Sequence, residues 1–440
     1  MYTKSSTRKF GIVVGVVAAL LLAACGADPL DLPDQPVPSG QRAEVPLVGQ
    51  AGYEDLAKSR DVAAERAWSI ALELAQHEEI KGGEANSITS GTGLYLALAM
   101  VGEGTAGDLA TELDEYLGLS GQERRNTVNL LLRELEYLDG DPADANKDEL
   151  PEESLLHIAN QVVVDDEWEL TQQYIDAVMA AFGATVATVD LGSQEGKDFL
   201  DAWVNRETGG LVEQSAVQPQ PSLALVFQNA LTMAARWELP FDAADTHPRT
   251  FTLADGTEVE AESMSQLTGL RYATHDGWQA VRLGYRDGLF SDVILPPEGQ
   301  LPEELTLDTL RALQDSLGRA AVEQVQLQLP KLDLTTSADL LPYLGEQLPL
   351  QIAGVPGGFA NMLETNKDAV LVLDQAVQQA VLRVDEAGTI AAVVTELGYT
   401  ESAAPMASIQ MQVDRPYLFT ISEETTGWPI LVANVGDPRG

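Results

Sequence analysis

Residues 384–421 read VDEAGTIAAVVTELGYTESAAPMASIQMQVDRPYLFTI, and this stretch decides the fold. Small and β-branched residues make up 389–395, a composition that favours a strand. No proline interrupts residues 389–400, so every backbone N–H there is free to join a ladder. Residues 398–408 are polar, small and proline-containing, as expected of an exposed loop. The sequence therefore predicts a strand that leads into a long exposed loop.

Side chains alternate along a strand, so each face of this one can be read separately. One face would carry only small or β-branched residues: Thr389, Ala391, Val393 and Thr395. Such a segment could enter a sheet as a central strand that is buried on both sides. An ordinary hairpin arm is the alternative interpretation.

The same stretch resembles two segments of the serpin family. Residues 384–395 resemble the serpin hinge, and residues 414–419 (DRPYLF) resemble the segment that follows the serpin reactive loop. Further blocks occur upstream in the family order: Ile158-Ala159-Asn160, Phe182-Gly183-Ala184, Val189-Asp190, Trp203-Val204, Thr208 with Gly210, and Phe227 to Phe241. The resemblance spans about residues 53–438. It implies an α+β serpin fold with three β-sheets, eight to nine surrounding helices and an exposed reactive-centre loop.

The resemblance also implies particular site residues. The hinge of the reactive loop would comprise Glu386, Gly388, Thr389, Ala391, Ala392 and Val393, and Trp237 would lie at the top of the main sheet. A buried polar cluster would comprise Asn86, Ser90, Asn229 and Gln378. Gly91 and Gly93 replace a usual proline and a usual serine near this cluster, and Gln378 replaces a usual histidine. We therefore expect an altered cluster.

Protease inhibition is the function that the resemblance implies. A protease would attack a loop bond as a substrate, and the cleaved loop would insert into the main sheet and trap the acyl-enzyme. Two ways of counting the family spacing place the scissile bond differently, one after Ser402 and one near Pro405. The candidates are Ser402, Ala403, Ala404 and Met406, with Ser402 preferred.

The residue type at this bond indicates the kind of protease. Small residues there suit elastase-like or subtilisin-like serine proteases, and cysteine proteases stay open. No lysine or arginine lies between Arg383 and Arg415, which disfavours trypsin-like targets.

The N-terminus predicts export and lipid anchoring. Basic residues precede an apolar run, residues 10–24, which is too short to span a bilayer and has the length of a signal-peptide core. The run ends in LAACG, residues 22–26, which resembles the bacterial lipoprotein cleavage box with Cys25 as the lipidated residue. An ordinary signal peptide with an incidental cysteine is the alternative. We expect a signal peptide at 1–24, a tether at 25–52 and one domain at 53–440.

This organisation predicts where the protein resides. Lipid chains on Cys25 would hold it on a bacterial membrane, on the periplasmic or the cell-surface side, without a spanning segment. We expect a monomer.

Net charge and motif spacing exclude several other classes of function. The chain of 440 residues has a net charge of −42, which opposes binding to nucleic acids. A GxGxxG pattern at 102–107 follows a predicted helix rather than a strand, so it indicates a helix end and a turn. The acidic segment 139–149 lacks the ligand spacing of a calcium loop.

The sequence also offers little for catalysis. Neither a GxSxG serine nor a metal-ligand spacing among His77, His157, His247 and His275 occurs. We expect no catalytic residues, no metal and no cofactor. A serpin-fold binding or scaffolding lipoprotein without inhibitory activity remains the main alternative, and an enzyme of unknown type is a further one.

Overall fold

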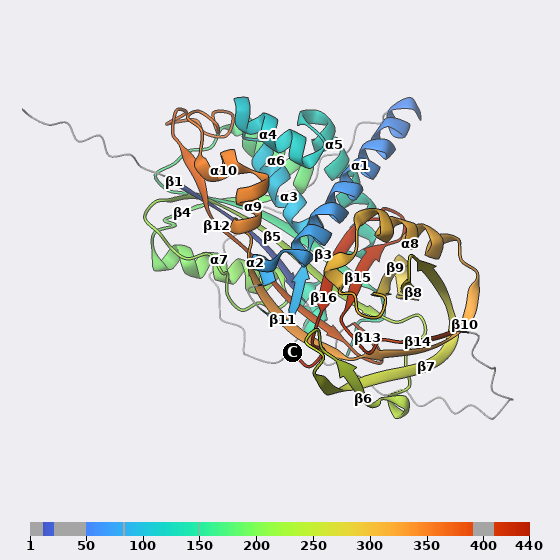
Figure 1. Ribbon diagram of the computed structural model, residues 1–440. Helices are drawn as coiled ribbons and strands as arrows, with labels where there is room; N and C mark the ends of the chain where they lie inside the picture. Colours follow the sequence, from blue (N-terminus) through green and yellow to red (C-terminus); the bar gives the residue numbers. More distant parts are fainter. Residues whose placement is uncertain (1–11, 22–49, 82–83, 148, 390–408) are drawn as a thin grey trace, which may run out of the picture.

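Two β-sheets form the body of the molecule, and the helices pack around them (Figure 1). The computed structural model describes residues 12–21, 50–81, 84–147, 149–389 and 409–440. Most helices gather at one end of the molecule, and the two sheets extend from there toward the opposite end (Figure 1).

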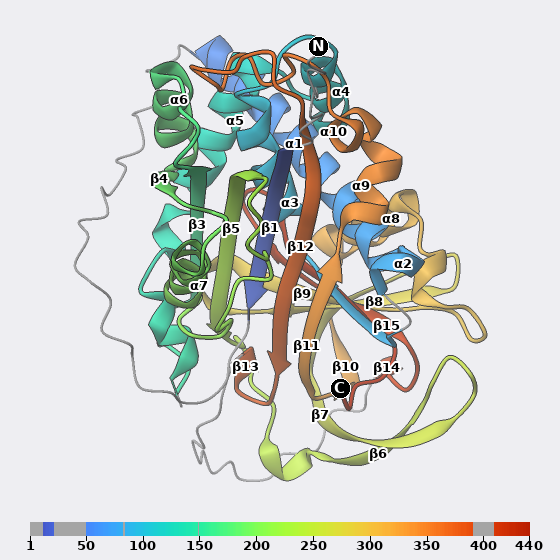
Figure 2. The same ribbon diagram turned by 90° about the vertical axis from the view of Figure 1, so that its left-hand side faces the viewer.

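Seven strands form the larger face visible in Figure 2. They are, from one edge to the other, β4 (Thr185–Val189), β3 (Leu155–Asp165), β5 (Leu223–Arg236), then β13 (Gly388–Thr389) and β1 (Ile12–Leu21) in the same position, β12 (Leu371–Val384) and β11 (Leu332–Asp339). We call this sheet the main sheet. Strand β5 is buried along almost its whole length, which explains its nearly unbroken apolar sequence.

Nine strands form a second sheet. They are β14 (Ile409–Gln412), β10 (Val322–Pro330), β7 (Glu258–His275), β8 (Trp278–Gly284), β9 (Leu289–Leu295), β15 (Tyr417–Glu423), β16 (Pro429–Val435), β2 (Asn86–Thr89) and, paired with β7, β6 (His247–Thr252). Strand β7 pairs with β6, then with β10, then with β8 along its 18 residues. The second and third sheets expected from the sequence are therefore joined through β7.

Helices surround these sheets. They are α1 (Gln50–Gln76), α2 (Glu78–Lys81), α3 (Gly91–Gly102), α4 (Gly107–Leu117), α5 (Gly121–Glu134), α6 (Gln172–Phe182), α7 (Gln194–Glu207), α8 (Leu307–Arg319), α9 (Leu341–Gln347) and α10 (Pro349–Ala353). Short 3-10 turns are η1 (Glu136–Leu138), η2 (Pro142–Asn146), η3 (Ala243–Asp245), η4 (Arg286–Gly288) and η5 (Pro302–Glu304). Within the described ranges no helix is long and apolar enough to cross a membrane.

Helix α3 is the centre of the core. All residues from Gly91 to Val101 are buried. The helix begins where the Ser90 hydroxyl accepts a hydrogen bond from the backbone N–H of Gly93 at 3.0 Å, a regular N-cap. The glycines at 102–107 lie between the end of α3 and the start of α4, so the interpretation of this motif as a helix end and turn is confirmed.

A close approach between α1 and α3 depends on glycine at position 91. A Cβ atom built on Gly91 would lie 1.9 Å from the carbonyl oxygen of Ala67 and 2.8 Å from the backbone nitrogen of Ala71. The residue that departs from the serpin pattern here thus allows two helices to touch through their backbones.

Gly91→Ala should destabilise the protein because the backbone contact leaves no room for a methyl group. We expect a loss of about 1–3 kcal/mol, the usual cost of overpacking, measured as a lower denaturant midpoint of the chain lacking residues 1–24. Gly345→Ala in α9 is the control, because nothing lies within 4 Å of a Cβ there. That variant should be neutral or more stable by ~0.5–1 kcal/mol. Equal effects of the two substitutions would contradict the packing account.

Candidate functional site

A tight turn reverses the chain at the end of β12. The carboxylate of Asp385 accepts hydrogen bonds from the N–H groups of Ala387, at 2.9 Å, and Gly388, at 3.2 Å. The backbone N–H of Asp385 donates to the carbonyl of Gly388 at 3.0 Å. Burial raises the pKa of Asp385, although the two N–H donors oppose the shift. The acidic start of the predicted hinge is therefore a structural turn.

The chain leaves this turn as a new strand of the main sheet. Thr389 pairs antiparallel with Val384 of β12 on one side and with Ala235 of β5 on the other. A Cβ atom on Gly388 would lie 2.2 Å from the carbonyl oxygen of Ala235, so only glycine fits there. The first residues of the predicted hinge thus occupy the position between β5 and β12.

A pair of stacked aromatic rings contacts the turn and this strand through hydrogen bonds. The hydroxyl groups of Tyr285 and Thr389 share a hydrogen bond of 2.5 Å, and Thr389 is fully buried. The ring of Tyr285 stacks on that of Trp237 with centroids 4.2 Å apart. Trp237 in turn donates from Nε1 to the carbonyl of Asp385 at 2.9 Å. Burial raises the pKa of Tyr285, so its phenol stays neutral and can donate.

The second carboxylate of the hinge is paired. Glu386 contacts the ammonium group of Lys331 at 2.7 Å and accepts a hydrogen bond from the hydroxyl of Thr246 at 2.6 Å. Burial alone would raise the pKa of Glu386, but these two partners outweigh it and lower the pKa. The backbone carbonyl of Glu386 also accepts from Phe241 at 2.9 Å. Both the side chain and the main chain of Glu386 are thus held.

Strand β1 occupies the rest of the position between β5 and β12. It pairs in parallel with residues 371–380 of β12 and residues 223–232 of β5. Strand β13 runs the opposite way, so the two segments approach each other head to head (Figure 2). The interval between β5 and β12 therefore accepts an added strand. The prediction that residues 1–24 are a signal peptide concerns their removal and stays a prediction.

The predicted cluster of four polar residues does not assemble as one group. Ser90 and Gln378 form a reciprocal pair, in which the Ser90 N–H donates to Oε1 at 2.9 Å and Nε2 donates to the Ser90 carbonyl at 3.1 Å. Asn229 instead donates to the side chain of Asn160 at 2.9 Å. Ala18 of β1 pairs with both Asn229 and Gln378, so an inserted strand separates them. The expected contact between Asn229 and Ser90 is corrected for this reason.

Asn86 has a different role from the one predicted. Its side chain donates to the carbonyl of Asp437 at 2.8 Å and accepts from the N–H groups of Gly436 and Asp437. It ties β2 to the C-terminal segment and takes no part in the pair of Ser90 and Gln378. Its place at the start of β2, opposite Val435, explains this difference.

Several predicted site residues lie outside the described part of the chain. They are the hinge positions Ala391, Ala392 and Val393, the scissile-bond candidates Ser402, Ala403, Ala404 and Met406, and the lipidation candidate Cys25. Their assignments stay predictions. Among the described residues, no group of three or more histidine, cysteine, aspartate or glutamate side chains could hold a metal ion.

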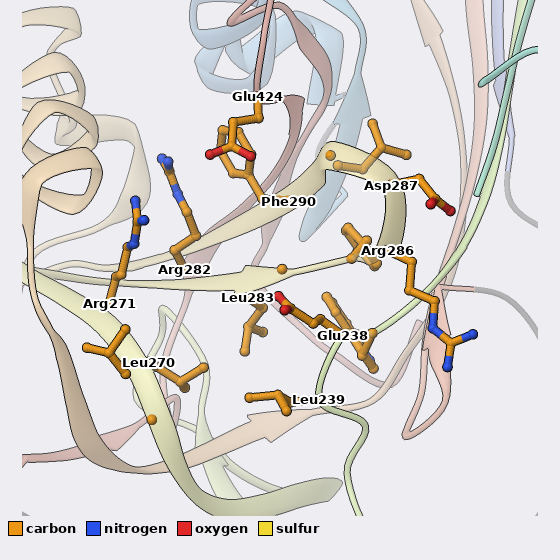
Figure 3. Close-up of a pocket in the computed structure, with 17 residues that line it drawn as sticks. Glu238, Leu239, Leu270, Arg271, Arg282, Leu283, Arg286, Asp287, Phe290 and Glu424 are labelled. Atoms are coloured by element: carbon orange, nitrogen blue, oxygen red, sulfur yellow. The ribbon is translucent and has the colours of Figure 1, made fainter. Parts of the chain in front are cut away.

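A pocket of about 660 Å³ is lined in part by the stacked pair of Trp237 and Tyr285. Arg271 and Arg282 extend on the same side of it (Figure 3). Arg282 forms a bidentate ion pair with buried Asp292, with both N–O distances 2.7 Å. Two residues of the pocket wall, Trp237 and Tyr285, thus also contact the hinge.

Sequence reasoning missed the partners of the hinge. Tyr285, Lys331 and Thr246 contact it, but they lie 55 to 140 positions away in the chain. No local motif marks them. The scarcity of cations is the one available signal for Lys331, since the chain has 26 lysines and arginines against 68 carboxylates.

Comparisons with known proteins identify the family. The profile described as "Serpin (serine protease inhibitor)" matches residues 65–438. Plasminogen activator inhibitor 1 of Bos taurus is 27% identical over 409 residues, which cover 89% of this chain and 95% of the relative. Serpin-ZXA of Oryza sativa subsp. japonica is 27% identical over 389 residues, which cover 84% of this chain and 94% of the relative.

Solved structures agree in fold. Serpin-12 of Manduca sexta superposes with a TM-score of 0.72 at 19% identity, covering 85% of this chain and 99% of that structure. Human thyroxine-binding globulin superposes with a TM-score of 0.71 at 21% identity, covering 87% of this chain and 99% of that structure. The thermophilic serpin tengpin superposes with a TM-score of 0.72 at 20% identity, covering 86% of this chain and 94% of that structure. This chain, with its α+β architecture and hinge, belongs to the serpin family of protease inhibitors rather than to any class of enzymes.

Proposed function

We propose that the protein inhibits serine proteases irreversibly by loop insertion, with cysteine proteases as a further target class. The protease nucleophile would attack a carbonyl in the loop, with Ser402 as the preferred residue, and form an acyl-enzyme while the new amine of Ala403 departs. The loop would then extend β13 between β5 and β12. The supporting observation is that Gly388 and Thr389 already pair antiparallel with both strands.

The length and composition of the loop support this mechanism. Fourteen residues from Thr389 to Ser402 would span about 45 Å as a strand, which is enough to carry a tethered protease along the main sheet. The inserting face holds small or β-branched residues, and residues 389–400 lack proline. The intact form is then held kinetically, and cleavage releases it to a more stable arrangement.

The target and the location of the protein follow from the predicted scissile region and N-terminus. Small residues at Ser402 to Ala404 favour elastase-like or subtilisin-like proteases over trypsin-like ones. Removal of residues 1–24 and lipidation of Cys25 would leave a monomeric domain tethered to a bacterial membrane. The removal would also withdraw β1 from the main sheet.

A serpin-fold binding or scaffolding lipoprotein is the second candidate function. Human thyroxine-binding globulin, named for its ligand, shares the fold. The unobstructed hinge favours inhibition, because neither proline nor a charged side chain lies on its inserting face.

Covalent trapping is the direct test of the proposed function. We expect the soluble chain 25–440 with Cys25→Ser, mixed with an elastase or a subtilisin, to form a complex that survives denaturing electrophoresis. Mass spectrometry should find a released peptide that begins at Ala403 or within the next few residues. Complete cleavage without any covalent band, for both proteases, would reject inhibition and favour the binding lipoprotein.

Val393→Arg should convert the inhibitor into a substrate. The inserted strand would bury an unpaired guanidinium at a cost of several kcal/mol, so the covalent fraction should fall by more than about tenfold. Val393→Thr is the matched control, because threonine has nearly the same volume and suits a strand. The ratio of complex to cleaved chain on gels measures the effect. A trapping efficiency of Val393→Arg equal to that of the control would contradict insertion.

The full-length chain should resist an added strand more than the processed chain does. Strand β1 fills the ladder as far as Thr232 and Ala380, which leaves little room beyond β13. We expect a synthetic peptide of residues 389–402 to raise the thermal midpoint of chain 25–440 carrying Cys25→Ser, and to raise that of the full chain much less. A scrambled peptide controls for composition. Equal shifts for both chains would show that β1 does not block this position.

A further inference from the structure

The pocket beside Trp237 and Tyr285 has a cationic end. Arg271 of β7 and Arg282 of β8 are direct partners across the two strands, so both side chains lie on the same face of the sheet. Both residues line the pocket, and Figure 3 shows them along one wall. Two like charges directly opposite each other destabilise a sheet. This end of the pocket therefore needs negative charge.

One of the two guanidinium groups obtains that charge from the protein. Arg282 forms its bidentate ion pair with Asp292, its partner on β9, whose carboxylate is fully buried. Arg282 also lies over the ring of Phe290, 3.7 Å from the ring centroid. Because its charge is already compensated, Arg282 contributes mainly to the shape of this end of the pocket.

The other guanidinium group lacks such a partner. The side chain of Arg271 donates one hydrogen bond, to the backbone carbonyl of Gly318 near the end of α8, at 3.3 Å. Within the described ranges, no carboxylate forms an ion pair with Arg271. The sequence offers 68 carboxylates for 26 lysines and arginines. A cation without an ion pair in so acidic a chain is therefore available to an outside anion.

Apolar surface adjoins this cationic end. Val322 of β10 is the ladder partner of Arg271, is 65% exposed and lines the pocket. Leu239 is 46% exposed and lines it as well. Tyr137 lies at the same rim, because a Cβ atom on Gly288 of the pocket wall would be 3.0 Å from its hydroxyl.

This rim holds much of the exposed apolar surface of the protein. Val322, Leu239 and Tyr137 are three of the five large hydrophobic side chains that are exposed in the described part of the chain. Exposed apolar side chains that gather in one place mark a binding surface. A volume of about 660 Å³ lies within the range of pockets that hold small molecules.

The carboxylates of the pocket limit what can enter it. Glu238, Asp287 and Glu424 also line its wall. Asp287 is engaged, because its carboxylate accepts a hydrogen bond from the backbone N–H of Ser154 at 2.8 Å. In Figure 3, Asp287 lies on the side of the pocket opposite Arg271. Together with the net charge of −42, these groups oppose a polyanion and favour an occupant with one negative charge.

We propose that this pocket binds a small amphipathic anion, a molecule with one carboxylate or sulfonate head and an aromatic or alkyl body. The head pairs with Arg271 and supplies the negative charge that Asp292 supplies to Arg282. The body covers Val322 and Leu239 at the rim. This site lies outside the predicted reactive loop, and the inference does not depend on the proposed inhibition.

The test uses a pair of fluorescent probes with the same rings. One is 1-anilinonaphthalene-8-sulfonate, and the other is N-phenyl-1-naphthylamine, which lacks the sulfonate and is uncharged. Each is titrated into chain 25–440 carrying Cys25→Ser at pH 7, without any protease. We expect the sulfonate to bind the parent chain more tightly than the amine does, because only the sulfonate pairs with Arg271.

Arg271→Gln should weaken binding of the sulfonate about tenfold, the effect of losing one charge-assisted hydrogen bond. Its affinity for the amine should stay that of the parent chain. Arg249→Gln is the matched control, because Arg249 is exposed on β6, away from the pocket, and its replacement removes the same charge. Equal sulfonate affinity in the two variants would reject the proposal, as would a parent chain that binds the amine as tightly as the sulfonate.

Glu238→Gln gives a second test that does not remove the cation. The loss of a carboxylate from the wall should strengthen binding of the sulfonate by at least about twofold. Decanoate should displace the sulfonate dye from the parent chain, whereas decanol should not. Weaker binding of the sulfonate to Glu238→Gln, or equal displacement by decanol, would show that the pocket does not select an anion and would overturn the proposal.

Discussion

Backbone hydrogen bonding between β5 and β12 is the constraint on which the rest of the structure depends. Both strands lie inside the main sheet, so their facing N–H and C=O groups must be paired, either with each other or with a strand between them. Two different segments meet this need here: β13 antiparallel at one end and β1 parallel along the remainder. Because strands of either direction pair in this position, it is backbone groups that bind the added strand. The length and the side chains of the incoming segment then decide which segment fits.

The hinge is built to start a strand in that site. The Asp385 turn reverses the chain, Gly388 allows the backbone of β5 to approach, and the hydroxyl groups of Tyr285 and Thr389 share a buried hydrogen bond. The pair of Glu386 and Lys331 fixes the same turn from outside. Each of these contacts is present in the described structure, so the proposed extension of β13 would need ladder formation beyond Thr389 and no change in the contacts of residues 385–389.

Much of this fold could be predicted from local sequence. The helix before the GxGxxG pattern and the turn that follows it are predicted by local signals, and both have their expected place in the structure. The extent of β7 could not be predicted, because whether one strand serves two sheets depends on which partners it meets. Helix α1 begins at Gln50, inside the segment 25–52 that was predicted to be a tether.

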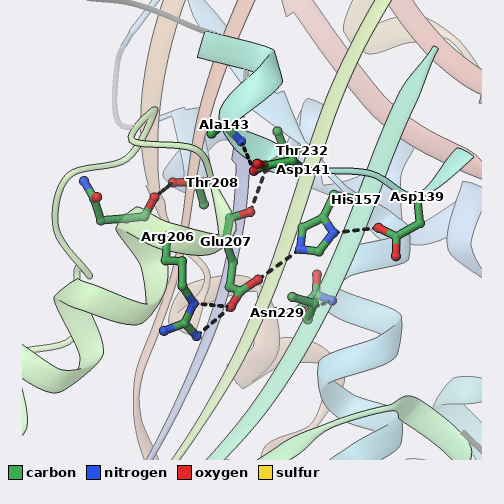
Figure 4. Close-up of polar contacts among 11 residues, drawn as sticks. Asp139, Asp141, Ala143, His157, Arg206, Glu207, Thr208, Asn229 and Thr232 are labelled. Carbon is green, nitrogen blue, oxygen red and sulfur yellow. Dashed lines mark hydrogen bonds and ion pairs between the residues drawn. The ribbon is translucent and has the colours of Figure 1, made fainter. Parts of the chain in front are cut away.

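The candidate site could be predicted only in part. Gly388 and Thr389 follow from composition, but Tyr285 and Lys331 are brought to them by tertiary pairing. The separation of Asn229 from Gln378 depends on β1, a segment that sequence analysis assigns to export. For His157, sequence analysis excluded only a metal-ligand spacing. Its two carboxylate partners, Asp139 and Glu207, lie 18 and 50 residues away, so only the folded chain reveals these contacts (Figure 4).

The most direct measurement of the central claim is the structure of the processed chain, beginning at residue 25 with Cys25→Ser, after cleavage of its loop. A crystal structure should show residues 390 onward continuing β13 as a full antiparallel strand between β5 and β12, with Ala392 level with Thr232 and Val381. The cleaved form should also melt at a higher temperature than the intact form. A cleaved loop left outside the main sheet, with an unchanged melting temperature, would contradict the account.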